Sequence, residues 1–374
     1  MRRLVTLPAL ALLAAACDGG PTAPRETDPG LPQRYTVVPF TPPPGTGDWR
    51  ARAVAINNRG QVLLDEPFSG RFLALWSGEG TTTLFPPPWE AQAHGLSDAG
   101  RIVGCTSAFG AWVAPEQRPI IGEGGRVWYL AGRGLERACA HDVNDAGTVV
   151  GMTVLGGRQR AFVLSQAQVT FVDVPGDTAA EAIEVNERGR VLLSSWRWAP
   201  EIGLTSRVIR GSLWRDGVLT ELGRLEWAAA GPGQVADVTR FSNVPGDLNE
   251  RDEVVGTSSG MVCTPDGRTC SGRSRAFLWR SGKMLDLGRT HEAKSSSAVA
   301  INRWGHVLLR LHEPGGAYTP LLWNEGTVLD LNEAIAATGW KLENVTDLND
   351  RGQVTGSARR GGTGDVVAVR LDPA

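Results

Sequence analysis

The stretches AVAINNRGQVLL (53–64) and TDLNDRGQVTG (346–356) are two copies of the pattern that decides the fold of this chain. In each copy an aliphatic residue precedes an Asn, two variable residues follow, and a Gly leads back into apolar positions. Apolar positions that alternate on both sides of a polar turn are typical of paired β-strands. The Asn side chain can bond its own backbone two residues on, and Gly supplies a positive φ. Each copy therefore predicts a β-hairpin.

The pattern occurs seven times. Its anchor position holds Asn57, Ser97, Asn144, Asn186, Asn249, Asn302 and Asn349. The first and last anchors are 292 residues apart, which gives about 49 residues per repeat, within the range of propeller blades. Six copies have the turn Gly, and the remaining copy has Asp252, a residue type that tolerates the left-handed region better than most. We interpret the Asn residues as structural turn residues without a catalytic role.

A second hairpin follows in most repeats, for example SLWRDGVLTELG (212–223) and LLWNEGTVLDLN (321–332). Two hairpins make four antiparallel strands per repeat. A Trp recurs in the third strand and is expected in the core, as Trp76, Trp214, Trp279 and Trp323. The last repeat shows only three strands and ends in DVVAVRL (365–371), and the segment YTVVPF (35–40) reads as an orphan strand. We therefore predict an all-β fold, a seven-bladed β-propeller over residues 34–374, with the ring closed by this N-terminal strand so that no edge stays free.

The repeats resemble the HAF repeats of bacterial extracellular proteins. The family pattern runs Asn-x-x-Gly-x-Val-Val-Gly, then His-Ala-Phe-Leu-Trp, then Asp-Leu-Gly. Here the middle block reads RAFLW (275–279) and RAFVL (160–164), with Arg in place of His. The resemblance spans about residues 50–371 and implies a repeat architecture and export; it implies no activity.

The N-terminus has the features of an export signal. Arg2 and Arg3 precede the apolar run 4–16, which is too short to span a bilayer. The stretch LLAAAC (12–17) resembles the lipobox of bacterial lipoproteins, which implies cleavage after residue 16 and lipidation of Cys17. The alternative is an ordinary secretory signal with a chance Cys. Residues 17–33 are polar and rich in Pro and Gly, as expected of a flexible tether.

The predicted topology places all the tight turns on one face of the disc and the long, variable segments on the other. These variable segments are 194–211, 223–245, 257–275, 289–297 and 333–345. Loops on rigid scaffolds often carry function, so the variable face is the expected binding surface. Trp196, Trp198 and Trp227 fall in it and are the candidate ligand-binding residues, because Trp suits stacking and apolar contact. The alternative is that they fill gaps between blades.

Four cysteines remain beside Cys17, an even number that fits an oxidising compartment. Cys263 and Cys270 lie in one segment (CTPDGRTC) and are a candidate disulfide, and Cys105 with Cys139, in neighbouring blades, is a second. Four acids precede the anchor by two positions: Asp142, Glu184, Asp247 and Asp347. We interpret them as turn-capping acids, since the late carboxylate of a calcium loop is missing. No metal and no cofactor is expected.

The charge of the chain is nearly balanced, with 38 basic and 40 acidic residues, which argues against nucleic-acid binding. We expect a monomer in the cell envelope, attached to the membrane through its lipid anchor, that binds a glycan or protein ligand and is not an enzyme. Two alternatives stay open. One is a structural scaffold in an envelope assembly. The other is an enzyme with a site in the central funnel, which would need acids or histidines converging on the axis.

Overall fold

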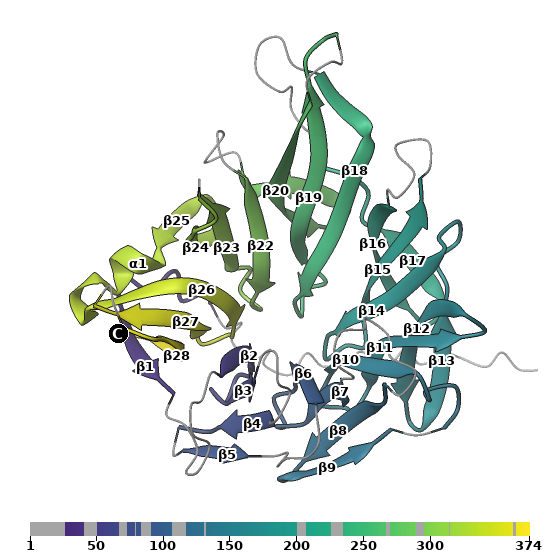
Figure 1. Ribbon diagram of the computed structural model, residues 1–374, viewed down its shortest axis with the longest axis horizontal. Coiled ribbons are helices and arrows are strands. Elements are labelled where there is room, and N and C mark those ends of the chain that lie inside the picture. Colours follow the sequence, from purple (N-terminus) through teal and green to yellow (C-terminus); the bar gives the residue numbers. More distant parts are fainter. Residues whose placement is uncertain are drawn as a thin grey trace, which may run out of the picture. The chain divides into compact units, whose positions relative to one another are not determined.

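In a computed structural model the chain forms seven four-stranded antiparallel sheets. The structure describes residues 27–40, 51–66, 73–78, 80–83, 91–106, 117–130, 132–199, 207–225, 235–266, 270–288, 295–313, 315–361 and 364–374. Residues 31–374 form one compact unit, in which the sheets are arranged radially around a central axis (Figure 1). The predicted fold class, a seven-bladed β-propeller, is confirmed.

Each of the first six blades is built from four consecutive strands. Blade 1 contains β2 (Arg52–Ile56), β3 (Val62–Asp65), β4 (Leu73–Trp76) and β5 (Thr81–Thr83). Blade 2 contains β6 (Ala91–Leu96), β7 (Ile102–Thr106), β8 (Pro119–Glu123) and β9 (Arg126–Tyr129). Blade 3 contains β10 (Ala138–Val143), β11 (Val149–Leu155), β12 (Arg158–Ser165) and β13 (Gln168–Val172).

The chain continues around the ring in the same way. Blade 4 contains β14 (Ala179–Val185), β15 (Val191–Trp198), β16 (Arg207–Arg215) and β17 (Val218–Glu221). Blade 5 contains β18 (Val235–Leu248), β19 (Val254–Cys263), β20 (Cys270–Arg280) and β21 (Lys283–Asp286). Blade 6 contains β22 (Ser296–Ile301), β23 (Val307–His312), β24 (Tyr318–Asn324) and β25 (Thr327–Asp330). A short helix, α1 (Leu331–Ala334), and a 3-10 turn (Ala336–Thr338) then lead into blade 7.

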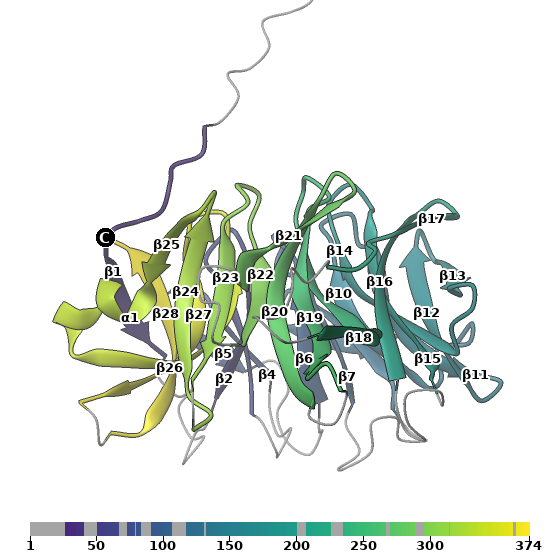
Figure 2. The ribbon, with the colours of Figure 1, turned by 90° about the horizontal axis from the view of Figure 1, so that it is seen from above.

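Blade 7 combines the two ends of the folded unit. It contains β26 (Trp340–Leu348), β27 (Val354–Arg360), β28 (Val366–Pro373) and, beside β28, the strand β1 (Tyr35–Pro39). The pairing runs from Tyr35 opposite Pro373 to Pro39 opposite Val369, and Figure 2 shows β1 against β28 from the side. The predicted closure of the ring by an N-terminal strand is therefore correct.

The inner strands of the blades form the core, and neighbouring sheets pack face to face. Between blades 5 and 6, for example, Val255 and Leu278 pack with Val307 and Leu309. Within a blade, neighbouring strands leave no room for a side chain at some strand glycines. A Cβ on Gly256 would lie 2.3 Å from the Val244 carbonyl oxygen and 2.8 Å from the Phe277 ring, so only Gly fits there. The predicted core residues Trp76, Trp279 and Trp323 are buried, and Trp214 is partly buried.

The first strand of every blade is irregular near the axis. Its register with the second strand shifts just before the residue two positions ahead of the anchor, as between Ala93 and Gly95 in blade 2 and between Ala140 and Asp142 in blade 3. The same shift occurs in the other five blades. Such a bulge re-aims the side chains around it. It therefore sets which side chains face the axis and which face the neighbouring blade.

Several of the variable segments, including 223–245 with β18 and 333–345 with β26, contain more strand than their composition suggested. β19 and β20 continue pairing out to Cys263 opposite Cys270, within the segment 257–275. β15 and β16 likewise pair as far as Trp198 opposite Arg207, within 194–211. The expectation of long loops is wrong for these parts, because the backbone hydrogen bonds of an antiparallel pair extend wherever both partners remain extended.

Candidate functional site

The anchor asparagines link neighbouring blades to one another. The side-chain Nδ2 of Asn57 donates to the Ser97 carbonyl at 3.0 Å, and Asn349 donates to the Asn57 carbonyl at 2.9 Å across the point of ring closure. Equivalent bonds of 3.0 to 3.2 Å connect Asn144 to Asn186, Asn186 to Asn249, Asn249 to Asn302 and Asn302 to Asn349. We call these six bonds the anchor belt.

The same asparagines also close their own turns. The Oδ1 of Asn249, for instance, accepts from the backbone N–H groups of Arg251 at 2.9 Å and Glu253 at 3.0 Å. The turn Gly residues and Asp252 all have positive φ, from 60° at Asp252 to 87° at Gly305. All six anchor asparagines are buried, as their bonds require. The interpretation of the anchor asparagines as structural turn residues fits this geometry. Their hydrogen bonds to the neighbouring blade did not follow from the local sequence pattern.

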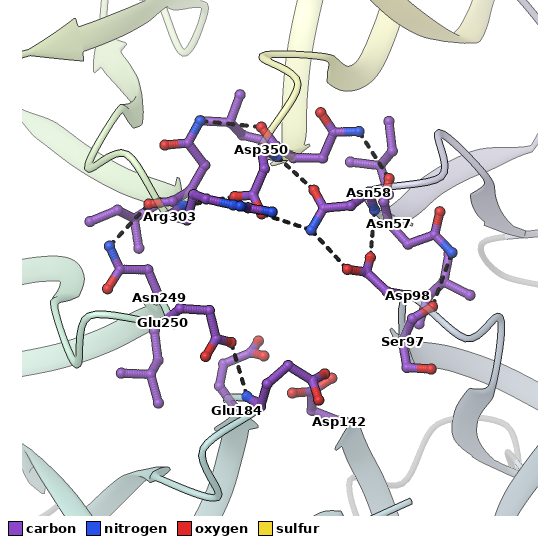
Figure 3. Close-up of a pocket in the computed structure, with 18 of the residues that line it drawn as sticks. Asn57, Asn58, Ser97, Asp98, Asp142, Glu184, Asn249, Glu250, Arg303 and Asp350 are labelled. Atoms are coloured by element: carbon purple, nitrogen blue, oxygen red, sulfur yellow. Dashed lines mark hydrogen bonds and ion pairs between the residues drawn. The ribbon is translucent and has the colours of Figure 1, made fainter. Parts of the chain in front are cut away.

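One position after each anchor, a second ring of side chains surrounds the mouth of a pocket on the axis (Figure 3). The backbone N–H of Asn58 donates to Asp98 at 2.6 Å, and that of Asp350 donates to Asn58 at 2.8 Å. The remaining members are Asp145, Glu187, Glu250 and Arg303, and Arg303 forms an ion pair with Asp350 at 2.8 Å. Five carboxylates against one Arg make this mouth acidic.

Below the mouth, the four acids two positions before the anchor converge on the axis. Asp247 accepts from the backbone N–H of Ile301 at 2.6 Å, and Asp347 accepts from that of Ile56 at 2.8 Å. Asp142 does the same for Val185 at 2.8 Å. The interpretation of these acids as caps of their own turns is therefore incomplete, because each of these three carboxylates holds the backbone of the next blade. Residues at the same position of each repeat lie at the same distance from the propeller axis. The repeat alignment could therefore have predicted that these four acids lie together.

The crowding of these acids changes their protonation. Burial, with repulsion from Asp247, raises the pKa of Asp347 to about 8, and burial raises the pKa of Asp247 to about 6. Glu184 and Asp142 are hydrogen-bonded to each other, and burial raises the pKa of both, that of Glu184 strongly. Two adjacent carboxyls in one site share a proton in preference to ionising together. The pocket above them has a volume of about 380 Å³.

Two of the candidate tryptophans, Trp196 and Trp198, are described by the structure. They lie together in blade 4, at the end of β15 that is far from the anchor turn. Trp196 and Trp198 are two residues apart on β15, so their side chains leave the same face of the sheet. The Arg207 guanidinium lies 4.7 Å from the centroid of the Trp198 ring and 5.5 Å from that of Trp196. The Trp198 side chain is 47% exposed. The third candidate, Trp227, lies outside the described residues.

These tryptophans form one wall of a pocket of about 550 Å³ between blades 3 and 4, which we call the aromatic pocket. Its other lining residues are Gly157, Arg158, Gln159, Asp177, Thr178 and Ala179. Arg158 donates to the carbonyls of Asp177 and Thr178 at 2.7 and 2.9 Å. The Asp177 carboxylate is held in turn by Ser195 at 2.6 Å and by Arg210 at 2.5 Å. The polar side of the pocket is thus fixed by its own hydrogen bonds.

The cysteines form disulfides on the body of the propeller. Cys105 of β7 is bonded to Cys139 of β10, which joins blade 2 to blade 3. Cys263 is also disulfide-bonded, and its backbone faces Cys270 across the β19–β20 pair. Beside the first bridge, Nε2 of His94 lies 3.7 Å from the Cys105 sulfur. Burial, with the nearby charges of His141 and Arg52, lowers the pKa of His94 to about 3. Cys17 lies outside the described residues.

Comparisons with solved structures agree with the architecture. The β-propeller domain of the Trilobed protease from Pyrococcus furiosus matches with a TM-score of 0.54 at 10% identity, over 87% of this chain and 97% of that one. A structure of YCF48 bound to D1 peptide matches with a TM-score of 0.50 at 9% identity, over 91% and 96%. Acylaminoacyl peptidase from Pyrococcus horikoshii matches with a TM-score of 0.51 at 12% identity, over 86% of this chain and 52% of that one. At such identities the likeness shows the fold alone.

The chain is thus a seven-bladed β-propeller, a fold that hosts many unrelated functions. No protein-family model matches it, and no curated protein sequence does. Within the described residues, every helix is too short or too polar to cross a membrane.

Proposed function

We propose that this protein is an exported, lipid-anchored β-propeller that binds a glycan or protein ligand in the aromatic pocket. The observation that carries the proposal is Trp198, which stays 47% exposed while its ring is fixed against Arg207. A large aromatic side chain held rigid at a pocket, instead of buried in the core, is the type of group that supplies binding energy at low entropic cost.

The rest of the pocket suits a ligand with both apolar and polar faces. The indoles offer stacking surface, while Arg158, Gln159 and Thr178 border the same space. Pockets for small ligands combine such apolar walls with a few fixed polar groups. Pyranose rings have one apolar face and a rim of hydroxyls, so a glycan is the ligand that we test first. Peptides with aromatic or aliphatic side chains are the second class.

The test is binding of the full-length protein to glycan and peptide arrays, followed by titration of each hit. We expect Trp198→Ala to weaken binding of the hit by about 10-fold to 100-fold, which corresponds to the loss of a buried aromatic contact. Trp196→Ala should weaken it to a similar extent. Trp128→Ala is the matched control, because Trp128 is 46% exposed but lies on the outer strand β9 of blade 2. Equal binding by wild type and Trp198→Ala would remove the aromatic pocket as the site.

A structural scaffold is the second candidate function, and the outer strands favour it. Val218 on β17 and Leu285 on β21 are 63% and 51% exposed. Apolar side chains presented outward in neighbouring blades can pack against another envelope protein. Cross-linking in whole cells distinguishes the two functions. Partners that are lost with Val218→Asp and Leu285→Asp but kept with Trp198→Ala would support the scaffold.

The proposed anchor rests on the lipobox-like stretch and the HAF-like repeats, together with the disulfide-bonded Cys105, Cys139 and Cys263, which suit an oxidising compartment. Cys17→Ala should abolish incorporation of a labelled fatty acid and move the protein from the detergent phase to the aqueous phase. Unchanged incorporation in this variant would refute lipidation at Cys17. We propose binding and not catalysis. The carboxylates of three axial residues, Asp142, Asp247 and Asp347, support this, because they already accept hydrogen bonds from backbone N–H groups of the next blade.

A further inference from the structure

We propose that Cys105 and Cys139, when their disulfide is reduced, bind one Zn²⁺ together with the imidazole of His94 and the carboxamide of Gln117. The ligand atoms of His94, Cys105 and Cys139 all lie within 4.8 Å of one another. Two thiolates and one imidazole form a donor set typical of tetrahedral zinc, with a fourth position to fill. This site is independent of the aromatic pocket and of the axial pocket.

The distances fit this metal after a small contraction. Nε2 of His94 is 3.7 Å from the Cys105 sulfur. Zinc bonds of about 2.3 Å to sulfur and about 2.0 Å to nitrogen place the ligand atoms of a tetrahedral site roughly 3.5 to 3.8 Å apart. The two sulfurs must separate in any case once the bond between them is broken. No element has to move as a whole, because the Cα atoms of the two cysteines are 4.9 Å apart.

Gln117 supplies the second, independent observation. This side chain is 91% buried and lies over the disulfide, with Nε2 3.1 Å from the Cys105 sulfur. Its Oε1 has no hydrogen-bond partner among the described residues. A buried carbonyl without a partner is destabilising, because it has lost its hydrogen bonds to water. Rotation of the amide by half a turn exchanges its O and N, which directs Oε1 to the sulfur side and makes it available as the fourth zinc ligand.

The fold brings these residues together from two blades. His94 is the bulge residue of β6, which turns its side chain away from the regular alternation of that strand. Cys105 is on β7, Gln117 lies two residues before β8, and Cys139 is on β10 of the next blade. Met152 packs against both cysteines and is 6% exposed, so it covers the sulfurs with an apolar side chain. A bound Zn²⁺ would therefore keep blades 2 and 3 joined in the reduced protein.

The conversion balances with a dithiol as reductant. The dithiol supplies two electrons and two protons, becomes a disulfide itself, and leaves two cysteine thiols on the protein. Zinc binding then displaces the two thiol protons to solvent, because thiolates are the ligands. The site is thus available only under reducing conditions, and its affinity should fall as the pH is lowered.

The test uses the full-length chain with Cys17→Ser, Cys263→Ser and Cys270→Ser, so that Cys105 and Cys139 are the only cysteines. Zn²⁺ is titrated in competition with a chromogenic chelator, before and after reduction with a phosphine. We expect one Zn²⁺ per reduced chain and none per oxidised chain. Co²⁺ as a probe should give thiolate charge-transfer bands and the intense visible bands of tetrahedral coordination.

Variants in this background assign the ligands. His94→Ala should weaken zinc binding by at least about 10-fold to 100-fold, the loss that follows even when only a supporting partner of a ligand is removed. Gln117→Ala should weaken it by about 10-fold, and His312→Ala, in blade 6, is the control that should not change it. Should His94→Ala fail to fold, X-ray absorption of the zinc-loaded background shows whether two sulfurs and a nitrogen bind. Absence of stoichiometric binding after reduction, or a zinc shell without sulfur, would overturn the proposal.

Discussion

Cys105 and Cys139 are joined across the one blade interface at which, among the described residues, the anchor belt has no bond. Every other interface has an Asn side chain that donates to the next anchor carbonyl. Blade 2 has Ser97 at the anchor, and within the described part of the chain its Oγ accepts only from the backbone N–H of Arg101 in its own turn. The disulfide therefore replaces, between blades 2 and 3, the hydrogen bond that a serine side chain is too short to make.

Restoring the missing amide should stabilise the propeller. In Ser97→Asn the new Nδ2 is expected to donate to the Asn144 carbonyl, just as each of the six anchor asparagines donates to the carbonyl of the next anchor. One such bond contributes about 0.5 to 1.5 kcal/mol to the free energy of unfolding. The gain should be seen in urea denaturation of both the oxidised and the reduced protein. A loss of stability in both states would show that the interface between blades 2 and 3 has no room for the amide.

Removing an anchor amide elsewhere should be costly. Asn249→Ala deletes the bond to the Asn302 carbonyl and the two turn bonds from Arg251 and Glu253. We expect the free energy of unfolding to fall by about 2 to 4 kcal/mol, because buried backbone groups then lose their partners. Ser97→Ala is the matched control, since among the described residues the Ser97 side chain bonds only within its own turn, and its cost should stay below about 1 kcal/mol. Equal costs for the two variants would contradict the role of the belt.

The contact that closes the ring should also carry much of the stability. Tyr35 on β1 is 2% exposed, packs in the core of blade 7 and donates its hydroxyl to the Gly352 carbonyl at 3.0 Å. Tyr35→Ala should lower the free energy of unfolding by about 3 to 5 kcal/mol, as for other buried aromatic truncations. Tyr35→Phe should cost about 1 kcal/mol. The exposed neighbour Thr36 provides the control, because Thr36→Ala should have little effect on urea denaturation. A tolerated Tyr35→Ala would mean that β1 is dispensable.

Much of the fold could be predicted because the same hairpin pattern occurs seven times in the sequence. The anchor and turn residues identify every first hairpin, and the orphan strand 35–40 follows from counting strands. The relations between blades could not be predicted from one hairpin alone. The bond from Asn349 to Asn57 joins residues 292 positions apart, and the hydrogen bond between Asp142 and Glu184 depends on how blades 3 and 4 pack against each other. The aromatic pocket was predicted in part, since Trp196 and Trp198 share a strand face, whereas Arg158 comes from blade 3 and Asp177 from the segment that joins blade 3 to blade 4.

The axial acids should make stability fall as the pH rises. Burial raises the pKa of Asp347 to about 8, whereas an Asp in the unfolded chain titrates near 3.9. Between about pH 4 and pH 8 the folded protein therefore keeps a proton that the unfolded chain has lost. The free energy of unfolding then decreases with pH, by up to about 1.4 kcal/mol per pH unit from this group.

Asp347→Asn removes this titration while keeping an oxygen that can accept from Ile56. We expect the variant to be about as stable as wild type near pH 4, where the buried carboxyl and the amide are both neutral, and to become more stable than wild type as the pH approaches 8, because only the wild type loses stability over this range. Urea denaturation at several pH values measures the difference. Asp216→Asn, at the exposed β16–β17 turn, is the control and should follow the wild type throughout. Parallel pH profiles for wild type and Asp347→Asn would show that the axial carboxyl is already ionised in the folded protein, and that its bonds to Ile56 and Leu348 outweigh its burial.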